Sequence, residues 1–458
     1  MPLTGTMLAW IAVGIALLTT GVVTTLWWAG TNGLTGGQLV TARFDALKIG
    51  LSLGIGSGGV VALYLAWRRQ RSTEDTLVHQ QEVAADTRAD AIERRITELY
   101  AKAAEQLGSD KAPVRLAGLY ALERVAQGNE NQRQTIVNVL CAYLRMPVDE
   151  PGAQEREVRL TAQRILAHHL RPGRDPEHPV DTFWADLDLD LTGATLVDVD
   201  FDHCRLRAPR LDGVTFLGEA RFRGTTFIGD TRFDGVTFAG SARFEKAVFA
   251  RNAWFDGAGF AGDVGFDEVT FARNASFRGV TFTGQAGFAG TAITRNAWFG
   301  KATFAGNADF RDASFRKVAE FHGVTFTGAA LFGKATFAGN VDFRGAGFRG
   351  NAAFGEAALR GNALFLGAVF HADAGFRRTA FTATAEFGGT TFTGNTGFVE
   401  ADFAGSAAFR GAAFARPPRL DRARFEHGCP PELAKWIPVA PPGVDDDPMP
   451  LRGDREAD

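Results

Sequence analysis

Large apolar residues recur at alternating intervals of six and five from residue 216 to residue 425, a period of 11. The series opens with Phe216, Phe222, Phe227, Phe233 and Phe238, and only three of the 39 Phe in the chain lie outside it. An 11-residue helical repeat would need apolar residues three and four apart, so this spacing excludes a helix. We call each large residue of the series a rung.

Smaller residues keep a fixed place beside the rungs. A small residue such as Ala220, Ala242 or Ala253 stands two positions before a rung, and a glycine such as Gly224 or Gly235 often follows two positions after it. This pattern predicts a solenoid whose wall bends once per unit, with the rung and the small residue pointing inward. The glycine then supplies a turn conformation that a Cβ would resist.

The units before the first Phe rungs are five residues long, and they carry a family resemblance. Gly193-Ala194-Thr195-Leu196 is the cleanest unit, and the large residues run at a strict five through Leu191, Leu196, Phe201, Leu206, Leu211 and Phe216. These units resemble the pentapeptide-repeat family, whose consensus is A(D/N)LXX. The resemblance implies a right-handed quadrilateral parallel β-helix, a pentapeptide-repeat solenoid, over residues 185–428.

The later units depart from the family pattern because every second unit gains a sixth residue. Four units then take 22 residues, and a seven-residue segment that begins at Phe249 recurs at Phe271 and Ile293, each time 22 residues on. The segment Phe299–Arg311 recurs at Phe332–Arg344, an interval of one and a half such turns, which predicts a copy displaced by half a turn.

The rungs predict about 11 coils and a rod of about 50 Å at about 4.8 Å per coil. One coil cannot be stable alone, so both ends of the rod need covers. We expect residues 155–184 to cover the start. The segment with Pro417, Pro418, Pro430, Pro431 and Trp436 is expected to cover the finish.

Two uncharged runs near the N-terminus are long enough to span a bilayer. Leu8–Trp28 would be about 31 Å long as a helix, and Ile49–Trp67 follows it with Gly50, Gly54 and Gly58 spaced four apart. We expect two transmembrane helices that pack through this glycine stripe, although the stripe could also reflect the general excess of glycine. A cleaved signal peptide is the alternative for the first run.

Basic residues predict the orientation of these runs. Arg68, Arg69 and Arg71 follow the second run directly, whereas the connection between the runs holds only Arg43 and Lys48. The positive-inside rule therefore predicts a multi-pass protein of the cell membrane with its N-terminus and β-helix in the cytoplasm. Neither run contains an ionisable residue, so an anchor is favoured over a transporter.

Residues 72–184 are predicted to form an α-helical adaptor and linker. Apolar positions at three-and-four spacing indicate helices over 72–108, from Pro113 to Gly128, and over 131–146. Val114-Arg115-Leu116 recurs as Val158-Arg159-Leu160, which suggests a two-helix repeat, and a membrane-proximal coiled stalk over 72–107 is the alternative. The predicted division is thus 1–71 anchor, 72–184 adaptor, 185–428 β-helix, and 429–458 cap and tail, with 438–458 disordered.

Nothing in the sequence predicts a catalytic, cofactor-binding or metal site. Adjacent His168 and His169 point to different faces of a helix, and we expect both on the surface. Cys204 stands at a small inward position and is expected to be a buried filler. The other cysteines are far away and no CxxC pair exists, which favours reduced thiols and argues against a disulfide scaffold. His322, His371 and His427 are each isolated in sequence.

The charge of the solenoid bears on its function. Some soluble pentapeptide-repeat proteins mimic DNA and occupy a topoisomerase, and such mimicry requires a strongly negative exterior. Residues 216–428 hold 24 Lys plus Arg against 19 Asp plus Glu, a balance of +5, which disfavours DNA mimicry. Arg251, Arg273 and Arg295 share one face and could bind nucleic acid or anionic lipid, but we interpret the charges as a solvated mixed surface, so neither contact is expected.

The sequence as a whole predicts a membrane-anchored scaffold, not an enzyme, that presents a rigid surface to an unidentified protein partner. A homo-oligomer through the rod end or the anchor is a further possibility. The alternative functions are a DNA-mimicking topoisomerase modulator and an enzyme that uses the helical adaptor.

Overall fold

The computed structural model describes residues 5–33, 36–147, 152–175 and 177–436. These form two compact units, residues 1–97 and residues 98–458. The predicted disordered tail, residues 438–458, lies outside the described residues.

The first unit is made of helix α1 (Gly5–Thr31) and most of helix α2 (Gly37–Leu107). Among the described residues, one stretch, Ala9–Thr31, is long and apolar enough to cross a membrane, and a signal sequence would share these properties. The predicted second span lies within α2, and the structure does not test it, because the side chains of residues 57, 58, 60 and 61 are not described. The range 72–108 is helical as predicted, but it continues the helix before it.

The predicted glycine stripe is confirmed at one position. A Cβ on Gly50 would meet Cγ2 of Val23 at 2.2 Å, so the two helices of the first unit approach closely there. At Gly54 an added Cβ would meet no atom within 4 Å. Gly50 is therefore a described position of the stripe at which a side chain would not fit between α1 and α2.

Three helices and a short turn open the second unit: α3 (Ala112–Gly128), η1 (Glu130–Gln132), α4 (Arg133–Arg145) and α5 (Ala153–His169). Pro113 lies in the first turn of α3, where a missing N–H costs nothing. Leu119, Leu122 and Val125 form the buried stripe of α3 that their spacing predicts. These helices pack on one another and on the first strand, β1 (Thr195–Val197).

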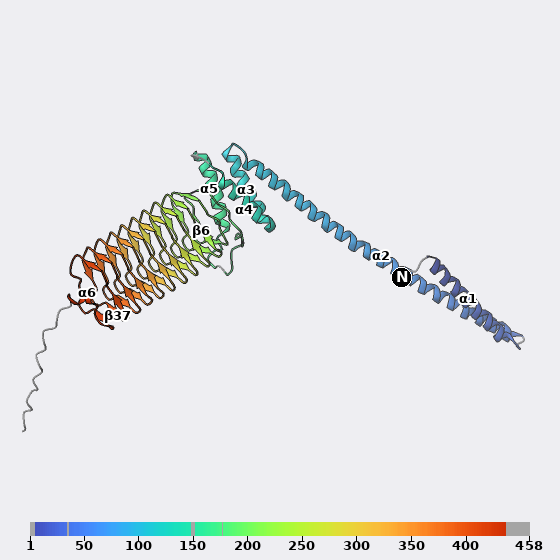
Figure 1. The fold of residues 1–458 in the computed structure, drawn as a ribbon. Helices are drawn as coiled ribbons and strands as arrows, with labels where there is room; N and C mark the ends of the chain where they lie inside the picture. Colours follow the sequence, from blue (N-terminus) through green and yellow to red (C-terminus); the bar gives the residue numbers. More distant parts are fainter. Residues whose placement is uncertain (1–4, 34–35, 148–151, 176, 437–458) are drawn as a thin grey trace, which may run out of the picture. The chain divides into compact units, whose positions relative to one another are not determined.

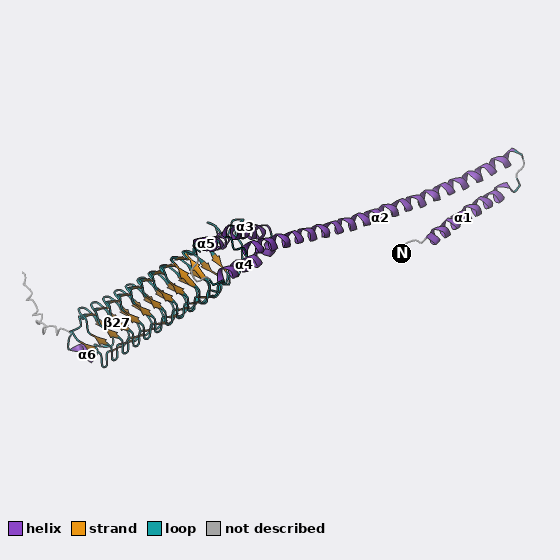
Figure 2. Cartoon of the chain, turned by 90° about the horizontal axis from the view of Figure 1, so that it is seen from above, coloured by secondary structure: helices purple, strands orange, loops and turns teal. Residues whose placement is uncertain are grey.

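Residues from 185 onward wind into a solenoid with four parallel sheets, one on each side of the coil (Figure 1, Figure 2). We number the sheets in the order in which the chain visits them. Sheet 1 contains β1, β3 (Thr215–Leu217), β7 (Thr237–Phe238), β11 (Gly259–Phe260), β15 (Thr281–Phe282), β19 (Thr303–Phe304), β23 (Thr325–Phe326), β27 (Gly347–Phe348), β31 (Val369–Phe370), β35 (Thr391–Phe392) and β39 (Ala413–Phe414). Sheet 2 contains β4 (Ala220–Arg221), β8 (Ala242–Arg243), β12 (Val264–Gly265), β16 (Ala286–Gly287), β20 (Ala308–Asp309), β24 (Ala330–Leu331), β28 (Ala352–Ala353), β32 (Ala374–Gly375) and β36 (Thr396–Gly397).

The other two sheets close the coil. Sheet 3 contains β2 (Arg205–Leu206), β5 (Thr226–Phe227), β9 (Val248–Phe249), β13 (Thr270–Phe271), β17 (Ala292–Ile293), β21 (Ser314–Phe315), β25 (Thr336–Phe337), β29 (Ala358–Leu359), β33 (Ala380–Phe381), β37 (Asp402–Phe403) and β40 (Arg424–Phe425). Sheet 4 contains β6 (Thr231–Arg232), β10 (Ala253–Trp254), β14 (Ala275–Ser276), β18 (Ala297–Trp298), β22 (Ala319–Glu320), β26 (Val341–Asp342), β30 (Ala363–Leu364), β34 (Ala385–Glu386) and β38 (Ala407–Ala408).

The register between coils confirms the predicted longer turn and shows how it begins. Leu196 pairs with Phe216 across a turn made only of five-residue units, whereas the turn from Leu206 to its partner Phe227 includes one six-residue unit. The turn from Phe216 to its partner Phe238 includes two, and this longer turn is kept in the coils that follow. The coil therefore widens as six-residue units replace five-residue units.

The rungs face inward, as predicted, and their rings pack in two ways. Rungs at equivalent positions in successive coils form a column. Along a column the rings stack nearly parallel, as with Phe233 and Phe255, whose centroids are 4.7 Å apart and whose planes differ by 2°. Between columns they meet edge to face, as with Phe222 and Phe233 at 5.9 Å and 85°. Both geometries are favourable for aromatic rings, so the core is an ordered stack of phenylalanines.

The corners of the coil are of two kinds. Two residues after each rung of sheets 2 and 4 from Phe222 onward, the backbone has a positive φ, for example 62° at Gly345 and 57° at Lys334. Two residues after a rung of sheets 1 and 3, the corner instead lies against the coil before it, because a Cβ on Gly306 would meet the carbonyl oxygen of Gly284 at 2.2 Å. Glycine thus serves different purposes at the two corners.

The predicted cover at the C-terminal end is present. Helix α6 (Pro431–Ala434) places Leu433 in the core with no exposed surface, and Trp436 packs on Phe414 with ring centroids 5.4 Å apart. The final apolar rungs are therefore partly shielded from water at that end, and Phe414 and Phe425 remain half-buried.

Candidate interaction surface

The helices at the start of the solenoid cover its open backbone edge through side-chain amides. The Gln163 side chain donates from Nε2 to the Val197 carbonyl at 2.9 Å and accepts from the Val197 N–H at 3.2 Å. Gln134 pairs in the same way with both backbone groups of Asp188, at 2.9 Å each. Each glutamine thus stands in for the missing preceding strand, which protects an edge that would otherwise pair with another chain.

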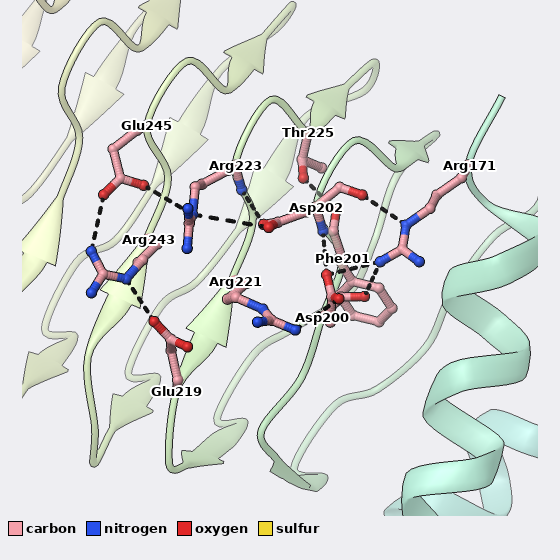
Figure 3. A network of polar contacts seen from close by, with 10 residues as sticks. All are labelled: Arg171, Asp200, Phe201, Asp202, Glu219, Arg221, Arg223, Thr225, Arg243 and Glu245. Carbon is pink, nitrogen blue, oxygen red and sulfur yellow. Dashed lines mark hydrogen bonds and ion pairs between the residues drawn. The ribbon is translucent and has the colours of Figure 1, made fainter. Parts of the chain in front are cut away.

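An arginine extends this cover to the next side of the first coil (Figure 3). Arg171 donates to the carbonyl oxygens of Asp202 and Asp200 at 2.9 and 3.0 Å, and it forms an ion pair of 2.8 Å with the Asp200 carboxylate. The Leu170 carbonyl also accepts from the Arg205 N–H at 2.7 Å. The predicted cover by residues 155–184 is therefore confirmed.

Charged side chains continue along sheet 2 from that point as a chain of opposite charges (Figure 3). Arg221 binds Asp200 at 2.8 Å, and Arg243 binds Glu219 at 2.6 Å. Hydrogen bonding to Glu219 raises the pKa of Arg243 above its ordinary value. These ion pairs link neighbouring coils on a half-exposed surface, where each contributes little to stability.

A hollow of about 700 Å³ lies near this junction, and ion pairs lie along its edge. Arg145 binds Asp190 at 2.8 Å, and Arg207 approaches Asp188 at 3.3 Å. Burial acts to raise the pKa of Asp190, but hydrogen bonds from Thr192 and the charge of Arg145 bring it below its ordinary value. An ionised, paired carboxylate of this kind is a poor general acid.

The histidine pair in α5 differs from the prediction at one residue. His168 is exposed as expected, but the prediction was wrong for His169, which is 2% exposed. His169 stacks on Trp184 at 3.7 Å, with Nδ1 2.6 Å from the Thr182 carbonyl oxygen and Nε2 2.8 Å from Glu123. Sequence spacing gave the correct faces of the helix, but it could not show that the chain after α5 folds back over one of them.

The buried thiols are inert. Burial raises the pKa of Cys141 to about 11 and that of Cys204 to about 12. The Sγ of Cys204 lies 3.5 Å from the Ala167 carbonyl oxygen, and the residue is 1% exposed. Cys204 therefore is the buried filler that its position predicts. Within residues 5–33, 36–147, 152–175 and 177–436, no three His, Cys, Asp or Glu residues are grouped to hold a metal ion.

The predicted half-turn displacement of the repeated segment is also confirmed. Asp309 pairs with Arg311 on sheet 2, and Asp342 pairs with Arg344 on sheet 4, with closest distances of 2.5 and 2.7 Å. The same local ion pair therefore appears on two sides of the coil, which shows that outward side chains act independently of the side they occupy.

Sheet 1 has an outer surface without charge over several coils. Its outward residues between 215 and 327 are Thr, Ala, Gly and Leu. Threonines recur in register at positions that include Thr281, Thr303 and Thr325. We call these outward residues of sheet 1 the threonine face. Sheets 2 and 4 carry several charged outward residues within the same coils, such as Arg243 and Glu320, whereas sheet 3 carries only Arg316 there.

A line of cations follows the corner between sheets 3 and 4. The register of the coils places Arg251, Arg273 and Arg295 in line, as predicted, and adds Lys317 in the next coil. All four are exposed, and none forms an ion pair with another described residue. We call these four residues the basic ridge. Sequence comparison of the repeated segments missed Lys317 because its segment differs, although its place one full turn after Arg295 would have revealed it.

A family comparison matches the solenoid. The model described as Pentapeptide repeats (9 copies) matches residues 191–237, 222–270, 266–314 and 310–358. The chain is a pentapeptide-repeat protein. No curated protein and no solved structure matches it. In this pentapeptide-repeat protein the family pattern fixes the inward residues. The residues that distinguish it from other members are therefore the outward-facing ones.

Proposed function

We propose that this pentapeptide-repeat protein is a membrane-anchored scaffold that presents its solenoid to a protein partner in the cytoplasm. The proposal rests on the contrast between the inward-facing and the outward-facing residues of the solenoid. The inward residues are almost uniformly Phe and small residues, whereas each outward column has its own chemistry. Such a rod can vary its surface without changing its backbone, which suits recognition.

The apolar stretch Ala9–Thr31 supports the anchor, since its length suffices for a bilayer. We further propose that Ile49–Trp67 is a second span and that Arg68, Arg69 and Arg71 retain the following residues in the cytoplasm. A phosphatase reporter fused to the C-terminus should then be inactive in intact cells. An active reporter would place the solenoid outside and overturn the orientation.

The threonine face is the surface we assign to the protein partner. A partner that covers it desolvates small apolar groups and hydroxyls but no charges, which avoids the largest cost of burial. DNA mimicry is disfavoured for the opposite reason, because the outward charges balance at +5 and not at a strongly negative value. Both ends of the rod are covered, so any homo-oligomer would form more readily through the anchor than through a rod end.

Proximity labelling from the C-terminus in intact cells tests this proposal. The same neighbours should be labelled by the native chain and by a control that carries Thr336→Lys, Ala358→Lys and Ala380→Lys on sheet 3. The triple variant Thr281→Lys, Thr303→Lys and Thr325→Lys should lose one specific neighbour. If both variants label the same proteins as the native chain, the threonine face is not the docking surface.

A further inference from the structure

The basic ridge breaks the packing rule of the corner on which it stands. In four other coils the same corner holds Gly229, Gly339, Gly361 and Gly405, and a Cβ there would approach backbone atoms of the preceding coil to between 2.2 and 2.5 Å; one further coil holds Ala383. The corner therefore favours glycine. Four successive coils carry Arg or Lys there instead, at a cost in packing that the fold does not require.

The ridge also carries an electrostatic cost. Successive coils lie about 4.8 Å apart, so neighbouring cations of the ridge start from Cα atoms closer together than a Debye length of about 8 Å at physiological salt. The corner segments that bear them, residues 250–252, 272–274, 294–296 and 316–318, contain no acidic residue. Arg316 adds a fifth exposed cation beside Lys317. The nearest carboxylate along this column belongs to Asp230, which accepts hydrogen bonds from the Asn252 backbone and side chain at 3.0 Å.

Ordered polar groups support the ridge from beneath. The Asn274 backbone N–H donates to Oδ1 of Asn252 at 3.4 Å, and the Asn296 N–H donates to Oδ1 of Asn274 at 3.1 Å. These asparagines follow the arginines directly in sequence, so they fix the backbone from which each cation projects. The ridge is therefore a straight line of charges on a rigid edge.

We propose that the basic ridge docks the solenoid on the anionic lipid headgroups of the membrane. A bilayer fits a straight edge of cations, because lipids diffuse to match them and no fixed spacing is required. Half-buried Trp254 and Trp298 follow shortly after Arg251 and Arg295 on sheet 4, and tryptophan is a residue of the membrane interface.

The inference deepens the proposed function, since it rests on an anchor that keeps the solenoid near a bilayer. Tethering raises the effective concentration of headgroups around the ridge. Each cation near an anionic surface favours docking by about fivefold, so four cations favour it by several hundredfold, on the order of 5 × 10². The rod would then lie against the membrane in a defined rotational setting.

Environment-sensitive fluorophores on the full chain in proteoliposomes test the docking. In a Cys429→Ser background, where the remaining Cys141 and Cys204 are each 1% exposed, a nitrobenzoxadiazole label is placed at Ala272→Cys beside the ridge or at Ala261→Cys on the threonine face. Emission at residue 272 should rise when phosphatidylglycerol is added to phosphatidylcholine vesicles and fall again in high salt. Emission at residue 261 should stay constant.

Two matched quadruple variants separate the ridge from general charge. Changing Arg251, Arg273, Arg295 and Lys317 to Gln should abolish the response at residue 272. Changing the exposed cations Lys301, Lys334, Arg349 and Arg410 to Gln lowers the net charge equally and should preserve it. Equal loss in both variants, or no response to phosphatidylglycerol in the native chain, would overturn the proposal.

Two further outcomes keep this proposal distinct from others. If duplex DNA raises the emission at residue 272 on phosphatidylcholine vesicles whereas phosphatidylglycerol does not, the ridge binds nucleic acid and the lipid proposal is wrong. If alkaline carbonate strips the chain from the vesicles, the anchor fails as part of the proposed function. The lipid response is measured before that wash, so it still tests whether the basic ridge binds anionic lipid.

Discussion

Replacing Phe310 tests whether stacked rings hold the solenoid together. Its side chain has no exposed surface and stacks between Phe288 and Phe332, with ring centroids 4.8 and 4.9 Å away. Phe299 and Phe321 meet it edge to face at 5.5 Å each. Phe310→Ala should destabilise the solenoid by about 3–5 kcal/mol, because the neighbouring rings are fixed by their own coils and cannot fill the cavity.

Phe310→Asp should do more, because it adds a carboxylate to a column with no partner for it. Desolvation of that group costs several kcal/mol beyond the lost ring, of order 3–5 kcal/mol in comparable buried sites. The two losses together reach about 6–10 kcal/mol, which is comparable to the whole stability of a typical domain. We therefore expect the aspartate variant to unfold the coils around residue 310.

Thermal unfolding followed by circular dichroism, combined with hydrogen exchange on the full chain in detergent, measures this effect. Protection should be lost first in the coils that contain Phe288 and Phe332, because each coil contacts only its neighbours. Phe414, a half-buried rung at the covered end, provides the control, and Phe414→Ala should cost less than Phe310→Ala. An unchanged melting curve for Phe310→Asp would refute the stacked-ring core.

Three other substitutions test the cap, the corners and the surface charges. Gln163→Leu should lower protection in the first coil by about 1–3 kcal/mol, since it leaves a buried strand edge without partners, and hydrogen exchange there should be faster while the C-terminal coils stay unchanged. Gly306→Ala should destabilise the fold by more than Gly345→Ala, since the first Cβ meets backbone at 2.2 Å and the second meets only the cost of about 1 kcal/mol for a positive φ; equal melting temperatures would contradict the two kinds of corner. Burial raises the pKa of Asp267 above its ordinary 3.8, so the folded state loses stability as pH rises from 3.8 through the folded-state pKa of this carboxyl. Asp267→Asn should remove that loss of stability. If the stability–pH curve of the variant is the same as that of the native chain, the loss does not come from Asp267.

The inward half of the solenoid could be predicted from the sequence because its residues obey a strict spacing. The positions of Phe216, Phe222 and Phe227 alone predict a period and an inward direction, and the register of the longer turn follows from the recurrence at Phe249 and Phe271. Each of these residues packs against the same residue type in the next coil, so few other side chains would fit at its position. The predicted rungs are therefore the rungs of the structure.

The features that sequence reasoning missed depend on contacts between distant segments. Gln134 and Gln163 are ordinary polar residues of amphipathic helices, and only their place above the first coil makes them substitutes for a strand. His169 is buried because Trp184, which lies beyond the end of α5, returns to cover it. The positive φ at Lys334 was also hidden, since the glycines at equivalent corners pointed to a glycine requirement that the structure does not impose.

The two kinds of corner determine which residues are informative about function, because equivalent positions in successive coils accept different side chains. At the corners after sheets 2 and 4, charged residues such as Lys334 and Glu356 replace glycine at the cost of a positive φ alone, because an added Cβ has open space at positions such as Gly345. At the corners after sheets 1 and 3, a Cβ added to a glycine would approach the preceding backbone closely, and outside the basic ridge these corners from residue 218 to residue 405 hold glycine or alanine. A run of large cations is therefore no evidence of a binding site at the first kind of corner, but it supports one at the second kind. The basic ridge stands at the second kind, which is why its four residues, and not the more numerous charges elsewhere, indicate a ligand.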